Sequence, residues 1–175
     1  KPGYTLSWTP EITPITADTT FIGTYQKNTH TLTLVLNNGQ PNIVLNIGYN
    51  EPITLTTPVY DKHAFKGWFN TTDHLEFNLT LMPDKDISAY AKWEELYYIF
   101  VDGQNITQNG IKVGQDITNL LEPKKEKRGH TFVGFFKNAS YTNELTDFIM
   151  PSEDLYVYAK FEINIYIVKL RSAKL

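Results

Sequence analysis

The chain has 175 residues, a formal net charge of −3 and no cysteine. The missing cysteines exclude a disulfide scaffold, thiol chemistry and a cysteine-based metal site. A slightly acidic chain also lacks the positive field that favours nucleic acid or an anionic membrane, and no apolar run reaches the length of a membrane span. Aromatic residues make up 14% of the chain, which helps small units to build a core.

The first half of the chain is predicted to form short strands. Residues 31–36 alternate Thr with apolar side chains, which is the period of a half-buried strand. Asn and Gly at residues 37–39 indicate a turn, and residues 42–47 then complete a hairpin. Residues 53–57 are compatible with either a short helix or an extended segment, which Pro58 ends.

The second half has a similar layout. Strands are predicted at residues 97–101 and 110–113. Asp116 is expected to cap a short helix over residues 117–121, because its carboxylate can accept hydrogen bonds from free backbone N–H groups. Pro123 is expected to end that helix. Two further strands are predicted at the end of each half and close it. The pattern therefore predicts units of about four strands and one short helix.

Those closing strands reveal an internal repeat. The segment HAFKGWF at residues 63–69 returns as HTFVGFF at residues 130–136, and AYAKW at residues 89–93 returns as VYAKF at residues 157–161. A fixed period of this kind indicates tandem modules. Tandem copies serve length or multivalent binding more often than catalysis, so the chain is not predicted to be an enzyme.

The N-terminus carries a shortened copy of the same motifs, at residues 3–8 and 18–25. Asp18, Asp86 and Asp154 are evenly spaced, 68 residues apart. This spacing places an acidic turn before the last strand of each copy.

The period divides the chain into four parts. Residues 1–28 are the C-terminal part of a repeat, residues 29–95 and 96–163 are full modules, and residues 164–175 are the opening strand of a further repeat. No Gly/Ser-rich or Pro-rich spacer separates them. Adjacent repeats are therefore expected to be closely coupled.

The order of these motifs resembles that of the internalin B-repeat, or Listeria–Bacteroides repeat, family over nearly the whole chain. His63 and His130 stand where that family usually has Gly, and Phe135 and Phe161 stand where it usually has Trp. The resemblance implies an α+β, β-rich fold of tandem β-grasp-like, ubiquitin-type modules. It also implies a place in extracellular bacterial proteins as stalks and adhesin segments, and it supplies no catalytic residues.

The aromatic residues of the repeated motif are interpreted as core rather than as a sugar-binding platform, because a unit of this size needs them inside. Phe69 and Phe136, with Tyr90 and Tyr158, alternate with inward-facing neighbours and are the members expected at the surface. The predicted repeat-signature core, in which Tyr90 and Tyr158 are the members that could be exposed, comprises Trp8, Phe65, Gly67, Trp68, Tyr90, Trp93, Phe132, Gly134, Phe135, Tyr158 and Phe161.

One basic cluster occurs, at Lys124, Lys125, Lys127 and Arg128. It is interpreted as a solvated loop, with a contact to anionic glycans as the alternative. Nucleic acid is not a predicted partner, because no aromatic platform or recognition helix accompanies the cluster. These four residues, together with Phe69 and Phe136, are the candidate ligand contacts.

No metal or cofactor is expected. His63 and His130 occupy equivalent positions in different modules, and Gly3 takes that position in the shortened copy, so they indicate a turn rather than zinc ligands. Asp84 and Asp86 lack the spacing of a calcium loop. Their side chains are expected to accept backbone N–H groups within the turn after Pro.

The sequence therefore predicts a non-catalytic tandem-repeat segment of a bacterial cell-surface or secreted protein, located outside the cell or at the cell wall. Its role would be that of a stalk or spacer with weak multivalent adhesion. One alternative is an adhesin module whose partner is a host-surface protein or glycan, and another is an accessory module of a surface enzyme. Neighbouring repeats are expected to contact one another, and exposed sheet edges could pair two chains into a dimer.

Overall fold

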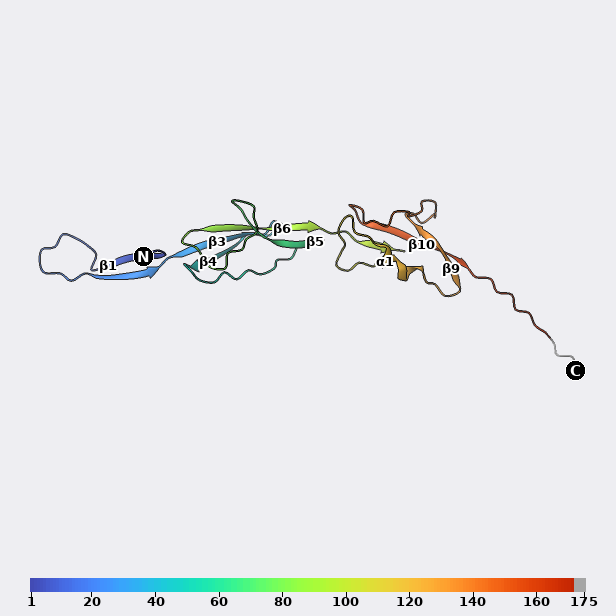
Figure 1. Ribbon diagram of the computed structural model, residues 1–175, viewed down its shortest axis with the longest axis horizontal. Helices are drawn as coiled ribbons and strands as arrows, with labels where there is room; N and C mark the ends of the chain where they lie inside the picture. The colour runs from blue at the N-terminus through green and yellow to red at the C-terminus, as the bar shows by residue number, and fades with distance from the viewer. Residues whose placement is uncertain (172–175) are drawn as a thin grey trace. The chain divides into compact units, whose positions relative to one another are not determined.

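Figure 1 shows a computed structural model of the chain, which describes residues 1–171. The structure divides into two compact units, of which the first is Lys1–Glu94 and the second begins at Glu95. The fold is β-rich: within the described residues, strands form one two-stranded and two four-stranded sheets, and a single short α-helix accompanies them. The coarse α+β expectation is confirmed.

The first unit contains a hairpin followed by a four-stranded sheet. In the hairpin the two strands pair antiparallel, with Tyr4 opposite Lys27. The four-stranded sheet has the spatial order β4-β3-β6-β5. The strands are β1 (Tyr4–Thr9), β2 (Ile22–Lys27), β3 (Thr29–Val35), β4 (Ile43–Gly48), β5 (His63–Asn70) and β6 (Ile87–Glu95).

The first and last strands of the four-stranded sheet are its central pair. Strands β3 and β6 run parallel with Leu32 opposite Ile87, whereas β3 and β4 run antiparallel. The predicted alternation in β3 is confirmed, since Leu32 and Leu34 are buried while Thr31 and Thr33 are half-buried. Successive side chains of a strand point to opposite faces, so the buried Leu residues mark the core face.

The second unit repeats this arrangement. Its sheet has the order β8-β7-β10-β9, and β7 and β10 are again central and parallel, with Ile99 opposite Leu155. The outer strands β8 and β9 pair antiparallel with their neighbours. The strands are β7 (Ile99–Val101), β8 (Gln104–Asn105), β9 (His130–Phe136) and β10 (Leu155–Ile163).

The strand predicted at residues 110–113 does not form, and only a single bridge joins Ile111 to Tyr97. Asp102 and Gly103 both have positive φ, of 49° and 83°. They form a tight turn of the kind that favours hairpins, so β7 pairs at once with β8.

The short helix occurs in the second unit only, so the expectation of one helix per unit is wrong for the first. Helix α1 spans Thr118–Leu121 and ends before Pro123, which lies in a 3-10 helix that follows over Glu122–Lys125. The Asp116 carboxylate accepts the backbone N–H of Thr118 at 2.8 Å, as predicted. Hydrogen bonds from the hydroxyl and then the amide of Thr118 hold the pKa of Asp116 below its usual range.

Residues 53–57 of the first unit have no helix. Aligning the two copies places Pro52 where the second has Asp116, so the carboxylate that receives the first helical amide is missing. Three Thr residues in this segment also have restricted side-chain rotamers in a helix. The segment forms neither a helix nor a strand, and a single bridge joins Pro52 to Leu81 just before it.

Each unit has its own core. Trp68 and Phe135, at equivalent positions, are 7% and 2% exposed. The half-buried rings of Phe65 and Trp93 pack against the first core, and those of Phe132 and Phe161 pack against the second. The first core comprises Leu32, Leu34, Leu36, Trp68, Phe77, Met82, Ala89 and Ala91; the second comprises Ile99, Val101, Ile111, Ile117, Leu121, Phe135, Leu145, Met150, Leu155, Val157 and Ala159.

Both tryptophans of the first module also donate hydrogen bonds. Trp93 Nε1 donates to the carbonyl of Leu36 at 2.8 Å, and Trp68 Nε1 donates to the carbonyl of Thr56 at 3.3 Å. Trp8, by contrast, is 43% exposed, so its predicted place in a core is wrong. It lies on a two-stranded hairpin, and such a sheet cannot cover a large ring on its own.

Replacing Trp68 by Ala is expected to lower the free energy of unfolding of the first module by about 3–5 kcal/mol, because a buried aromatic ring leaves a cavity. Trp8→Ala is the matched control and should cost far less, because the ring of Trp8 is already exposed. Urea unfolding followed by far-ultraviolet circular dichroism measures both. Equal losses for the two variants would contradict this assignment of the core.

Candidate functional site

Each module contains a Met-Pro turn that is anchored in the same way. Met82 and Met150 are both 1% exposed. The Met82 amide donates to the carbonyl of Glu51 at 2.9 Å, and the Met150 amide donates to the carbonyl of Gln115 at 2.8 Å. Burial and these hydrogen bonds fix the turn against the loop that follows β4 in the first module and β8 in the second.

The aspartate after each turn holds the start of the parallel strand pair. Asp86 Oδ1 accepts the backbone N–H of Thr31 at 2.8 Å, and Asp154 Oδ1 accepts that of Tyr98 at 2.9 Å. Acceptance of backbone N–H groups was predicted, but within the turn itself. The structure instead places Thr31 on β3 and Tyr98 directly before β7, so each carboxylate links the first strand of its module to the start of the last.

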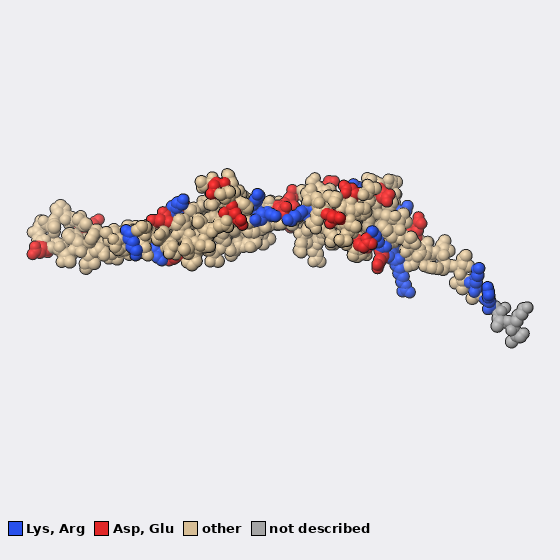
Figure 2. All heavy atoms as spheres, viewed as in Figure 1, with Lys and Arg blue, Asp and Glu red and all other residues tan. Residues whose placement is uncertain are grey.

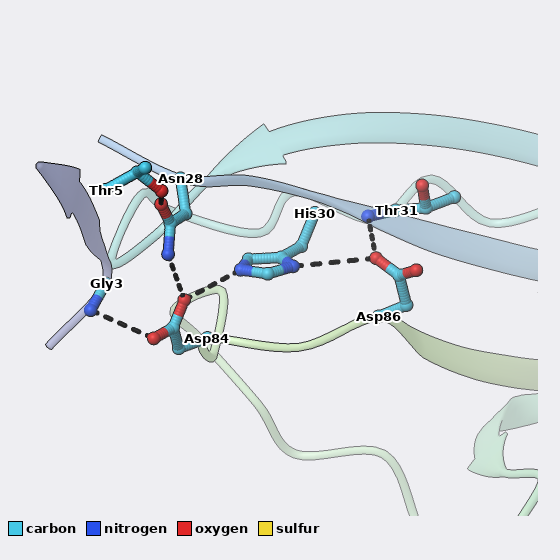
Figure 3. A network of polar contacts seen from close by, with 7 residues as sticks. All are labelled: Gly3, Thr5, Asn28, His30, Thr31, Asp84 and Asp86. Carbon is cyan, nitrogen blue, oxygen red and sulfur yellow. Dashed lines mark hydrogen bonds and ion pairs between the residues drawn. The ribbon is translucent and has the colours of Figure 1, made fainter. Parts of the chain in front are cut away.

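A second aspartate of the first module, Asp84, joins that module to the preceding hairpin (Figure 3). Its Oδ2 accepts the backbone N–H of Gly3 at 2.9 Å, and its Oδ1 accepts the side-chain amide of Asn28 at 2.8 Å. His30 Nε2 lies 2.8 Å from the same Oδ1. One carboxylate therefore contacts the hairpin, the connection between β2 and β3, and β3 itself.

Hydrogen bonds from Asn28 and His30, and a weaker one from the Gly3 amide, hold the pKa of Asp84 below its usual range. All three groups favour the charged carboxylate, because a carboxylate accepts hydrogen bonds more strongly than a carboxylic acid. The contact is thus built for an ionised Asp84.

Asn28 is the second centre of this junction. Its side-chain oxygen accepts the hydroxyl of Thr5 at 2.7 Å, and its backbone amide donates to the carbonyl of Gly3 at 2.9 Å. Its own carbonyl accepts the amide of Tyr49 at 2.8 Å. Asn28 therefore contacts both the hairpin and the loop after β4.

Gly3 packs closely against the ring of Tyr49. It is buried, has a φ of +73°, and a Cβ built on it would lie 1.9 Å from the Tyr49 ring. The ring of Tyr4 meets that of Tyr49 edge-on at 6.4 Å. A residue with a side chain at position 3 would displace either the hairpin or Tyr49.

An exposed ion pair flanks the junction. Lys27 Nζ lies 3.0 Å from Glu51 Oε1, and the Gly48 amide donates to Glu51 Oε2 at 3.2 Å. Hydrogen bonding between the two side chains raises the pKa of Lys27 and lowers that of Glu51. Because both side chains are largely in solvent, the pair adds little to stability.

The second module does not repeat the Asp84 junction. Ser152 takes the position of Asp84, Tyr97 that of His30 and Glu95 that of Asn28. The sequence motifs did not reveal this site, since Asp84 was considered only as a turn or calcium residue and His30 has no counterpart in the second module. The missing counterpart of His30 was the available signal, because a polar residue that only one module has can serve a contact that only this module makes.

The candidate ligand contacts in the basic cluster lie on the 3-10 helix and the loop after it. Lys125 Nζ is 2.6 Å from Glu122 Oε2, and Lys127 Nζ lies 5.3 Å from the centre of the Phe161 ring. Lys124 and Lys125 are half-buried, while Lys127 and Arg128 are exposed. Figure 2 shows acidic and basic side chains interspersed on the visible face of this unit.

The two aromatic candidates differ in exposure. Phe69 is half-buried, with the Tyr90 ring 5.9 Å away and Lys92 Nζ 5.1 Å from its own ring. Phe136 is only 9% exposed, because the ring of Tyr141 packs edge-on against it at 5.6 Å. The expectation that Phe136 lies at the surface is therefore wrong.

No group of three or more metal-ligating side chains is found within residues 1–171. His63 and His130 are the first residues of β5 and β9, directly after a turn and not, as predicted, within it. Each ring Nδ1 lies near a backbone carbonyl, that of Asp61 at 2.6 Å and that of Arg128 at 2.9 Å.

Comparison with known proteins accounts for this repeated architecture. A sequence model of the Listeria–Bacteroides repeat domain matches residues 24–92 and 98–160. The chain belongs to the Listeria–Bacteroides repeat family. Each match covers one four-stranded sheet, and the first begins within β2 of the hairpin.

Two relatives come from Evansella cellulosilytica. The chain is 34% identical over 122 residues to a protein named "Putative membrane protein" and 27% identical over 173 residues to a "Putative Gly-rich membrane protein". These matches cover 65% and 94% of this chain but only 18% and 20% of the relatives. The chain thus spans about a fifth of the length of each relative. In the described part of this chain, no helix is long and apolar enough to cross a membrane.

Gly3→Ala is expected to detach the hairpin from the first module, because the new methyl group would overlap the Tyr49 ring. Gly39→Ala is the matched control, since Gly39 has a similar φ of +80° but no atom within 4 Å of a built Cβ. Amide hydrogen exchange should accelerate across β1 and β2 in the first variant only. Equal effects would show that backbone strain, and not the contact with Tyr49, controls docking.

Asp84 should make hairpin docking sensitive to strong acid. Because its pKa is lowered in the folded state, its stabilising effect is complete above the usual carboxyl range and is lost as the pH falls through the lowered pKa. Hairpin amides, with exchange rates corrected for pH, should lose protection in that window. Asp84→Asn should remove most of this acid sensitivity, and an unchanged acid profile in that variant would assign the effect to another carboxylate.

Proposed function

We propose that this Listeria–Bacteroides repeat segment is a non-catalytic spacer in a bacterial cell-surface or secreted protein. The observation that carries the proposal is the strand order, in which the first and last strands of each module are parallel neighbours. The chain therefore enters a module at one end of this pair and leaves at the other end. Each repeat then adds length, as a spacer requires.

The same geometry suits a segment under tension. A pull on the two ends of a module loads β3 against β6, or β7 against β10, along the strand direction. All hydrogen bonds between the two strands then share the load, together with the Asp86 or Asp154 carboxylate at the start of the pair. Simultaneous loading resists separation better than opening one bond at a time.

Connections between repeats are short, which supports close coupling. Strand β2 ends at Lys27 and β3 begins at Thr29, while β6 ends at Glu95 and β7 begins at Ile99. Residues 164–171 form no strand in the structure. We extend the proposal to residues 164–170 as a segment that would become the first strand of a further β-grasp-like repeat once it is paired. Its apolar side chains are solvent-exposed, including Ile165 at 89% and Leu170 at 92%, and a further module would cover them.

The surface or extracellular location rests on the family and on the names of the two relatives. Both relatives are named as putative membrane proteins, and the match to this chain covers a small part of each. We propose that this chain likewise separates other parts of a longer protein from the cell envelope.

An adhesin is the second candidate, and the exposed Lys127 and Arg128 favour it. The basic cluster belongs to the second module alone, because the first has Tyr60 and Asp61 in the corresponding segment. A surface feature that one repeat has and the other lacks is suited to a specific contact, and an anionic glycan would be the matching partner.

A glycan array that includes heparan and dermatan sulfates separates the two candidates. The spacer proposal predicts no saturable binding of the labelled chain, even at high micromolar concentration. Saturable binding that is lost when Lys124, Lys125, Lys127 and Arg128 become Ala would establish the adhesin. The matched control replaces Lys1, Lys66, Lys85 and Lys137 by Ala, which removes the same charge elsewhere.

A further inference from the structure

His30 lies between two carboxylates at the junction of the hairpin and the first module (Figure 3). Its Nε2 is 2.8 Å from Asp84 Oδ1 and its Nδ1 is 3.6 Å from Asp86 Oδ1, and its side chain is 19% exposed. A neutral imidazole carries a proton on only one nitrogen, whereas an imidazolium carries one on each. Only the charged ring can therefore direct an N–H towards both aspartates.

Other charged groups near the ring do not cancel this effect. Lys27 lines the same shallow recess as His30, but it is paired with Glu51. Lys85 lies between the two aspartates in sequence and lines a separate recess with Asp86. On the neighbouring strand β4, the residue opposite His30 is the uncharged Ile47. The two aspartates are thus the charged groups in direct contact with the ring.

The ring shares its acceptor with the hairpin. Asp84 contacts His30 through Oδ1 and the Gly3 amide through Oδ2. A ring that donates from Nε2 to Oδ1 holds the carboxylate in the orientation that accepts Gly3. The neutral ring can make this hydrogen bond too, but the charged ring makes it stronger, because charge-assisted hydrogen bonds exceed neutral ones. The protonation state of His30 therefore affects how firmly the hairpin is docked.

We propose that His30 is a proton switch that tightens the junction between the hairpin of one repeat and the module that follows. Histidine is the side chain that changes charge between about pH 5 and pH 8, so mild acidity would stiffen this junction. The second module, with Tyr97 and Ser152 at the matching positions, has no such switch. A chain of these repeats would then contain responsive and unresponsive junctions.

This inference deepens the proposed spacer function by naming what regulates one of its junctions. Docking of the hairpin is a local property of the first unit, and it is measured separately from glycan binding. A missing pH response would overturn the switch and leave the spacer proposal intact, whereas saturable glycan binding would overturn the spacer and leave the docking result unchanged.

The test uses the full chain with two nitroxide labels, at Thr16→Cys in the hairpin loop and at Val59→Cys. Both positions are exposed, and the chain has no other cysteine. Pulsed electron paramagnetic resonance gives the distribution of distances between the labels. From about pH 8 to about pH 5.5 the ratio of docked to undocked hairpin should rise roughly threefold, which is the size of effect expected from a partly exposed ion pair.

Two variants hold the side chain at position 30 in a single charge state. His30→Gln cannot gain a proton, so its distribution should stay at the wild-type profile of high pH. His30→Lys carries a permanent charge, so it should stay docked at both pH values. His74→Gln is the matched control, since His74 is exposed and lies outside the network, and it should keep the wild-type response. Identical wild-type distributions at the two pH values, or a full response in His30→Gln or His30→Lys, would overturn the proposal.

Discussion

Parallel pairing of the first and last strands is the constraint on which each module depends. A parallel pair needs a long crossover, so β4 and β5 occupy the two edges and the intervening loops cover one face of the sheet. The Asp86 and Asp154 carboxylates hold the start of this pair by accepting an amide on, or directly before, the opposite strand. The spacing of these aspartates in the sequence thus reflects a contact between strands that are far apart in the chain.

The two modules retain this scaffold while their other contacts vary. In the first module, tryptophan side chains donate to backbone carbonyls at two motif positions, whereas phenylalanines fill both positions in the second. The Asp84 junction is likewise confined to the first unit. Variation therefore falls on side-chain hydrogen bonds and on the contacts of one repeat with the next, while strand order stays the same.

Much of the strand layout could be predicted because it depends on local patterns. Alternation of Thr and Leu identified β3, and the repeated aromatic motif identified β5, β6, β9 and β10. The helix predicted after Asp116 forms in the second unit. The helix expected in the first unit does not form, because Pro52 stands at the position of Asp116. The family assignment also followed from the motifs and is confirmed.

Predictions failed where the outcome depends on what covers a residue or on which distant groups meet. Trp8 matches the motif but lies on a hairpin that cannot enclose it. Phe136 alternates outward, yet the ring of Tyr141 covers it. The contact of Asp84 with Gly3 spans 81 residues, and no periodic pattern indicates it. Such contacts depend on tertiary packing, and a single sequence carries no local signal for them.

Single-molecule pulling on the two ends of the chain tests most directly whether the repeats are separate load-bearing modules. The parallel arrangement predicts two unfolding steps of similar size, each releasing on the order of 200 Å of chain, because each four-stranded sheet unfolds as one unit under shear. One combined step, or gradual lengthening without distinct steps, would contradict the account of two modules each held by its own central strand pair.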